Sequence, residues 1–140
     1  MVVRWRATTA LVVVFGACAM PAVATSGPAL DYTLNCQGCH RADGTGTPGT
    51  VPALAGSVAK FLKVPGGREY LSRVPGVSQA PLDDAALAAV LNWMLERFDH
   101  ADVPADFRPY TAEEVGRLRA DPLTDVTTRR ALIEKIDRAK

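Results

Sequence analysis

Aromatic side chains are scarce in this sequence, with two Trp, three Tyr and four Phe among 140 residues. A core with so few large rings has room for a bound prosthetic group. The sequence also lacks a serine or cysteine triad, an acidic metal cluster and a glycine-rich loop between a strand and a helix, so hydrolase and nucleotide-binding chemistry are not indicated. Charge of one sign is not in excess, because the formal net charge is +1, and nucleic-acid binding is therefore not expected.

The first 24 residues have the pattern of a secretory signal peptide. Arg4 and Arg6 precede an apolar run over residues 10–19, and a small-x-small cleavage site follows at 22–24. The apolar run is too short to span a bilayer, so we expect no membrane span after cleavage. The pattern predicts export to the periplasm of a Gram-negative bacterium. An alternative is a lipoprotein, because the residues leading to Cys18 resemble a weak lipoprotein box.

Cleavage after residue 24 leaves only two cysteines, Cys36 and Cys39, and both lie in a Cys-x-x-Cys-His motif that ends at His40. On a helical turn, residues three and four apart share one face, so two thiols and an imidazole can meet one ligand. Each thiol can add across a haem vinyl group to form a thioether, and the imidazole can supply an axial nitrogen to iron. The motif predicts one haem c, covalent through Cys36 and Cys39, with His40 as the proximal iron ligand.

Two other uses of the cysteine pair fit the sequence less well. A zinc site needs four ligands, and His100 is the only histidine outside the motif. A thioredoxin-like redox pair belongs in a βαβ setting, which the surrounding sequence does not provide.

The residues around the motif resemble class I c-type cytochromes, which are small helical domains with an N-terminal Cys-x-x-Cys-His. Tyr32 stands where that family has an aromatic residue on its first helix. Residues 42–46 look like the family's Gly-rich turn, and residues 51–56 are similar to its Pro-x-Leu-x-Gly segment. The resemblance implies that the Pro52 carbonyl accepts a hydrogen bond from His40 and so orients the ring.

A helix is predicted near the middle of the second half of the chain. Asp83 and Asp84 favour its start through capping and the helix dipole. Apolar residues then recur at helical spacing: Leu87, Val90, Leu91, Met94, Leu95 and Phe98. The resemblance, which covers residues 29–98, makes this the family's last helix and implies that Trp93 crosses Tyr32.

The loop over residues 74–81 departs from the family, because it lacks the methionine that usually binds iron on the distal side. Met94 is a candidate distal ligand, although a methionine on an apolar helix face usually fills the core. Other candidates are His100, Gln79, Lys60 and Lys63. An open distal site is a further alternative, and it would allow gas binding or peroxidase-like chemistry.

Basic residues outnumber acidic ones between Arg41 and Arg73. Such a rim would steer an acidic redox partner, and the alternative is a solvated face. After a linker predicted over residues 99–110, a capping box at 111–114 and an amphipathic pattern from about Thr124 predict two more helices. This extension would pack back on the core or dock on a partner enzyme.

The sequence therefore predicts an all-α cytochrome c fold around one covalently bound haem, with a C-terminal helical extension. The expected divisions are a signal peptide over 1–24, a cytochrome c domain over 25–98, a linker over 99–110 and the extension over 111–140. The expected function is electron transfer by a carrier rather than an enzyme, from a dehydrogenase donor to an oxidase or other acceptor. The alternatives are a haem protein with an open distal site and a haem subunit of a larger dehydrogenase complex.

Overall fold

The computed structural model describes residues 27–125 and 127–139, and these residues are built from helices joined by loops. In the described ranges no strand occurs, and one isolated bridge pairs Thr47 with Val51. The predicted all-α fold is confirmed. The predicted signal peptide lies outside the described residues. The elements are α1 (Pro28–Asn35), α2 (Gln37–His40), η1 (Ala59–Lys63), α3 (Gly67–Arg73), α4 (Pro75–Ser78), α5 (Asp84–Asp99), η2 (His100–Asp102), α6 (Ala112–Arg119) and α7 (Thr127–Arg138).

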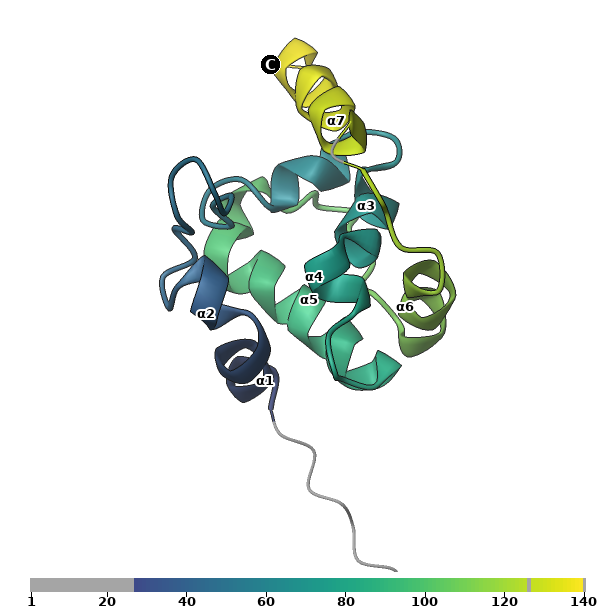
Figure 1. The fold of residues 1–140 in the computed structure, drawn as a ribbon. Coiled ribbons are helices and arrows are strands. Elements are labelled where there is room, and N and C mark those ends of the chain that lie inside the picture. The colour runs from purple at the N-terminus through teal and green to yellow at the C-terminus, as the bar shows by residue number, and fades with distance from the viewer. Residues whose placement is uncertain (1–26, 126, 140) are drawn as a thin grey trace, which may run out of the picture.

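Helix α5 runs through the centre of the molecule (Figure 1). It begins as predicted, because the Asp83 carboxylate accepts a hydrogen bond of 2.7 Å from the backbone N–H of Ala86. Its predicted apolar face is buried at Leu87, Val90, Leu91, Met94 and Leu95. Burial of each such side chain contributes about 1.5–3 kcal/mol, so this helix supplies a large part of the core. Across the part of the chain that is described, no helix is long and apolar enough to cross a membrane.

Helix α1 crosses the C-terminal half of α5 through an aromatic cluster. The ring of Tyr32 lies 5.2 Å from that of Trp93 and 5.1 Å from that of Phe98. This confirms the predicted crossing of Trp93 and Tyr32. The Tyr32 hydroxyl also donates a hydrogen bond of 2.7 Å to the carbonyl of Arg41, a residue with a φ of 64°. The contact holds the left-handed turn that ends α2, a conformation costly for a residue other than glycine.

The C-terminal extension packs back on the helices that precede it. Helix α6 lies against α5 and α3, and α7 lies against η1 and α3 (Figure 1). Val115 of α6 and Leu132 of α7 are buried in the same core as α5. Helix α6 begins with the predicted cap, since the Thr111 hydroxyl accepts from the backbone N–H of Glu114. Val115 and Leu132 therefore pack in the core of the protein itself.

Tyr110, in the segment predicted as a linker, is a core residue that the sequence reasoning missed. Its backbone N–H donates to Asn92 of α5 at 2.8 Å, and its hydroxyl donates to the carbonyl of Arg68 at 2.8 Å. Burial raises the pKa of Tyr110, which keeps the hydroxyl protonated as a donor. The connection between α5 and α6 is thus fixed to both helices that it passes.

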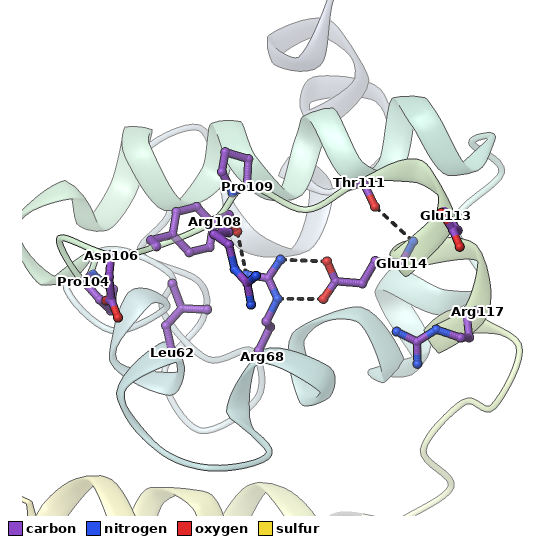
Figure 2. Close-up of a pocket in the computed structure, with 11 residues that line it drawn as sticks. Leu62, Arg68, Pro104, Asp106, Arg108, Pro109, Thr111, Glu113, Glu114 and Arg117 are labelled. Carbon is purple, nitrogen blue, oxygen red and sulfur yellow. Dashed lines mark hydrogen bonds and ion pairs between the residues drawn. The ribbon is translucent and has the colours of Figure 1, made fainter.

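Arg68 joins helix α3 to the extension (Figure 2). Its guanidinium donates to both carboxylate oxygens of Glu114, at 2.6 and 2.7 Å, and to the carbonyl of Arg108 at 2.7 Å. It also lies over the ring of Tyr110, 4.1 Å from the ring centroid. These hydrogen bonds hold the pKa of Glu114 below its usual range. Bidentate pairing of this kind fixes geometry as well as charge, so α6 has a defined position.

Candidate functional site

The short helix α2 brings together the three residues of the Cys-x-x-Cys-His motif. The backbone N–H groups of Cys39 and His40 both donate to the carbonyl of Cys36, at 3.2 and 3.0 Å. This single turn puts all three side chains beside one cavity. Neither thiol forms a disulfide. Two thiols and an imidazole therefore face the same space, as the motif spacing predicts.

The cavity has a volume of about 270 Å³ and is lined mainly by apolar side chains. Leu54, Val58 and Phe61 come from the segment that follows the motif, and Leu71, Val74 and Val77 come from α3 to α4. Met94 of α5 also lines it. An apolar space with a few convergent donors is the usual form of a cofactor site.

His40 is oriented by Pro52, which lies in the loop after the motif. The Nδ1 atom of His40 is 3.1 Å from the carbonyl oxygen of Pro52. A carbonyl oxygen can only accept, so Nδ1 carries the proton and Nε2 keeps a free lone pair. Burial lowers the pKa of His40, while the hydrogen bond to Pro52 opposes that effect. The ring is therefore a neutral imidazole with one nitrogen available as a ligand.

Two glycines allow the loop to return close to α2. The backbone N–H of Gly46 donates to the carbonyl of His40 at 3.0 Å, and the N–H of Leu54 donates to the carbonyl of Gly44 at 2.7 Å. At Gly46 the φ is 66°, and a Cβ there would lie 2.4 Å from the carbonyl oxygen of Val51. Only glycine fits this approach without a shift of backbone. The turn thereby brings Pro52 to His40.

These features suit a covalently held haem. The thiols can form thioethers with the two vinyl groups, a neutral imidazole follows directly, and the apolar lining can cover a flat hydrophobic ring. The residues around the cavity therefore fit this group.

The comparisons with known proteins agree with the site. The family model described as Cytochrome c matches residues 24–71. Cytochrome c-552 of Thermus thermophilus is 43% identical over 107 residues, which cover 64% of this chain and 82% of that protein. The chain belongs to the cytochrome c family. A second cytochrome c-552, also from Thermus thermophilus, is likewise 43% identical over 107 residues, covering 64% of this chain and 72% of that protein.

As a cytochrome c, the chain carries one haem c, bound covalently through Cys36 and Cys39. Its general role is electron transfer. The haem would fill the apolar cavity beside α2. Because the ring occupies this space, the core needs few aromatic side chains.

The candidates for the distal side of the cytochrome differ in where they lie. Met94 is buried and lines the cavity. The other side chains do not line it: His100 pairs with Glu96 on the exposed side of α5, Gln79 is exposed, and Lys60 and Lys63 pair with Asp102. The structure thus brings Cys36, Cys39, His40, Pro52 and Met94 together around one cavity and keeps the other four candidates outside it.

The basic stretch predicted as a rim is largely paired within the cytochrome itself. Lys60 and Lys63 lie 3.7 and 2.5 Å from the carboxylate of Asp102. Arg68 pairs with Glu114, and Arg73 lies 2.6 Å from Asp121. The acidic partners come from residues after α5, which the sequence reasoning treated separately. These pairs offset part of the local positive charge, and the acidic redox partner stays a prediction.

Two polar residues that reach the cavity from segments distant from the motif were missed from the sequence. Tyr70 of α3 and Arg129 of α7 both line it. Burial raises the pKa of Tyr70, while the charge of Arg129 and a hydrogen bond from it act in the opposite direction. No local signal marks these residues, because each lies in an ordinary amphipathic segment and reaches the cavity only through tertiary packing.

Proposed function

We propose that this cytochrome is an exported one-electron carrier that accepts electrons from a dehydrogenase or membrane complex and passes them to an oxidase or another acceptor. The observation that carries the proposal is the pairing of His40 with Pro52 beside the two cysteines, in an apolar cavity. This arrangement offers an oriented imidazole nitrogen, and among the described residues that line the cavity there is no Asp or Glu to act as a general acid or base. The role is that of a carrier rather than an enzyme.

Each residue of the site has a distinct part in this role. Cys36 and Cys39 would keep the haem on the protein after export, and His40 would supply a nitrogen ligand to its iron. Pro52 orients the imidazole and increases its electron donation through the hydrogen bond at Nδ1. The bound haem supplies the one-electron chemistry, with iron alternating between its ferrous and ferric states. The apolar walls exclude water, which limits reorganisation when the charge changes.

The proposed location follows from the N-terminal sequence. A leader over residues 1–24 would carry the chain to the periplasm, where haem attachment at Cys36 and Cys39 would follow export. The expected mature chain begins at Thr25.

The test is electron exchange by the purified, haem-loaded chain from a periplasmic fraction. We expect one reversible one-electron transition, and rapid reduction and reoxidation by small redox mediators without consumption of a substrate. An irreversible transition, or recovery of the chain only from the cytoplasmic fraction without haem, would contradict the proposal.

A second function is favoured by one observation on the distal side. The segment that follows α3 contributes Val74 and, from helix α4, Gly76 and Val77 to the cavity, and none of these residues has a side chain that binds iron. A haem protein with an open distal site would bind small gases or peroxide. The two functions differ in the visible spectrum of the ferrous form with and without carbon monoxide. Ready binding of carbon monoxide supports the second function and counts against a plain carrier, whereas an unchanged spectrum supports the carrier.

A further inference from the structure

The connection between α4 and α5, residues 79–83, folds around one side chain of the C-terminal extension. The Nε atom of Arg119 donates to the carbonyl of Ser78 at 3.0 Å. Its two Nη atoms donate to the carbonyls of Ala80 and Leu82, each at 2.7 Å. One Nη atom also lies 3.3 Å from a carboxylate oxygen of Asp84. Three alternate carbonyls of one short segment therefore point at the same guanidinium.

These carbonyls have no backbone donor. In the described part of the chain, no backbone N–H donates to the carbonyls of residues 78, 80 and 82. Ser78 and Ala80 are buried, and a buried carbonyl without a donor is costly. The planar fork of a guanidinium can serve several acceptors at once. The side chain of Arg119 is only 17% exposed, so protein oxygens replace most of the water around this cation.

The position of Arg119 is set by the packing of helix α6. The ion pair of Arg68 with Glu114 fixes the first turn of this helix. Gly116 lets the helix lie close to the start of α5, because a Cβ there would clash with the Asp84 carboxylate. Arg119, in the last turn, therefore reaches the connection from a defined place.

The connection continues into a wall of the haem cavity. Val74, Gly76 and Val77 line the cavity, and the last two belong to α4. Helix α4 lies beside α3, across from α1 and α2, so this wall faces the Cys-x-x-Cys-His motif (Figure 1). The backbone N–H of Ala80 donates to the carbonyl of Val77 at 3.1 Å. This hydrogen bond joins the wall to the segment that Arg119 holds.

We propose that Arg119 is a positioning residue for the haem site, because it holds the carbonyls of residues 78–82 and thereby keeps α4 closed over the axial position of iron opposite His40. Haem iron has two axial positions, one on each face of the ring. The inference rests on haem attachment at Cys36 and Cys39 and on His40 as the proximal ligand, as in the proposed function. It goes beyond that function, because it makes the C-terminal extension control the access of small molecules to iron.

The role of Arg119 has three measurable consequences. Loss of the guanidinium frees the connection, so the hydrogen bond of Ala80 opens more often and its N–H exchanges faster with solvent. Helix α4 can then move away from the ring, which lets an added ligand as large as imidazole bind ferric haem faster and more tightly. Water also reaches the ring more easily and favours the more highly charged ferric state, so the midpoint potential falls.

The experiment compares Arg119→Gln and Arg119→Lys with two control variants of α6, in chains that carry covalent haem by intact mass. Arg117→Gln removes a charge at an exposed position of the same helix. Glu114→Gln loosens α6 at its pair with Arg68 and leaves the contacts of the connection untouched. The measurements are imidazole binding to the ferric protein, the midpoint potential and hydrogen exchange over residues 77–82. All are made where circular dichroism shows each variant to be folded.

We expect several-fold faster and tighter imidazole binding in Arg119→Gln, with a lower midpoint potential and several-fold faster exchange at Ala80. Arg119→Lys should show a smaller increase, because an ammonium keeps the charge but cannot match three carbonyls at once. Arg117→Gln and Glu114→Gln should bind imidazole as the wild-type protein does.

Three results would overturn the inference. The first is unchanged imidazole binding in Arg119→Gln, even with faster exchange, which would leave the arginine a purely structural role. The second is wild-type binding in Arg119→Lys, which would make the charge alone sufficient. The third is an equal increase in Glu114→Gln, which would reflect general loosening of α6. If Arg119→Gln does not retain haem, Arg119→Lys decides by the same criteria.

Failure of the proposed function would show in the wild-type chain, before any variant is compared. Absence of covalent haem would count against attachment at Cys36 and Cys39, and an irreversible transition would count against the carrier. Neither result depends on Arg119, so the two failures are distinguishable.

Discussion

His40 and Pro52 are twelve positions apart in the chain, yet the imidazole Nδ1 lies 3.1 Å from the proline carbonyl oxygen. The contact requires the tight return of the loop over residues 42–54, which the glycines at 44 and 46 permit. Since the acceptor is a backbone atom, its position depends on the conformation of the loop rather than on one side chain. The proximal half of the site is therefore only as rigid as this loop.

Pro52→Ala should raise the midpoint potential of the haem. The substitution keeps the carbonyl but frees its φ angle, so the hydrogen bond to His40 weakens and the imidazole donates less electron density to iron. Potentiometric titration of the haem-loaded protein measures the effect. Pro48→Ala, at an exposed position of the same loop, serves as the control and should leave the potential unchanged. Equal potentials for wild type and Pro52→Ala would contradict the role of this hydrogen bond.

Gly46→Ala should destabilise the protein more than Gly49→Ala. Both glycines have a positive φ, 66° and 77°, so each substitution incurs the strain of the left-handed region, about 1–2 kcal/mol. At Gly46 the new Cβ would also meet the Val51 carbonyl oxygen, whereas nothing lies within 4 Å at Gly49. The added overpacking should cost a further ~1–3 kcal/mol, measured by denaturant unfolding. Equal costs would show that the loop relaxes freely.

Met94→Leu should leave the visible spectrum unchanged, because Met94 lies on the apolar face of α5 and is expected to fill the core. A volume-conserving exchange there costs less than about 1.5 kcal/mol, whereas Met94→Ala should cost about 2–5 kcal/mol. Absorption spectra in both oxidation states and denaturant unfolding test the two statements. If Met94→Leu removes a low-spin spectrum, Met94 is the distal ligand.

Glu114→Gln should lower the free energy of unfolding at neutral pH. It should also remove the loss of stability that the wild-type protein shows when the pH falls and Glu114 is protonated. The hydrogen bonds from Arg68 hold the pKa of Glu114 below its usual value of about 4.3, so the stability they add is present above that value and is lost as the pH falls through the folded-state pKa. We expect a loss of about 1–3 kcal/mol at pH 7 that diminishes below pH ~4. Chemical unfolding at both pH values checks this.

Glu113→Gln is the matched control for Glu114, since Glu113 is the neighbouring acid and is exposed. Its effect should stay within about 0.5 kcal/mol. If both variants lose the same stability at pH 7, the pairing with Arg68 contributes nothing specific.

Local patterns in the sequence predicted the parts of the molecule that depend on neighbours in the chain. Asp83 caps α5 and Thr111 caps α6, because a capping side chain reaches only its own first turn. Helical periodicity predicted the buried face of α5 for the same reason. The crossing of Tyr32 and Trp93 needed more than periodicity, and it came from the resemblance to class I cytochromes.

The ion pairs could not be predicted from local patterns in the sequence. Lys63 and Asp102 are 39 residues apart, and Arg68 and Glu114 are 46 apart, so a count over one stretch of sequence cannot include partners from another. Tyr110 likewise lies in a segment whose sequence is typical of a linker, and only its contacts with Asn92 and Arg68 make it a core residue.

The sequence by itself determined the attachment turn at Cys36, Cys39 and His40, because residues three and four apart on a helix share a face whatever surrounds them. Only the tertiary structure decided what else reaches the cavity. It brought Arg129 and Tyr70 into the lining of the cavity and left His100 outside, since the packing of α7 and the direction of α5 are set by contacts across the whole core. Chemistry that depends on one helical turn can be predicted from neighbouring residues in the sequence. The charge around the cofactor depends on segments that meet only after folding.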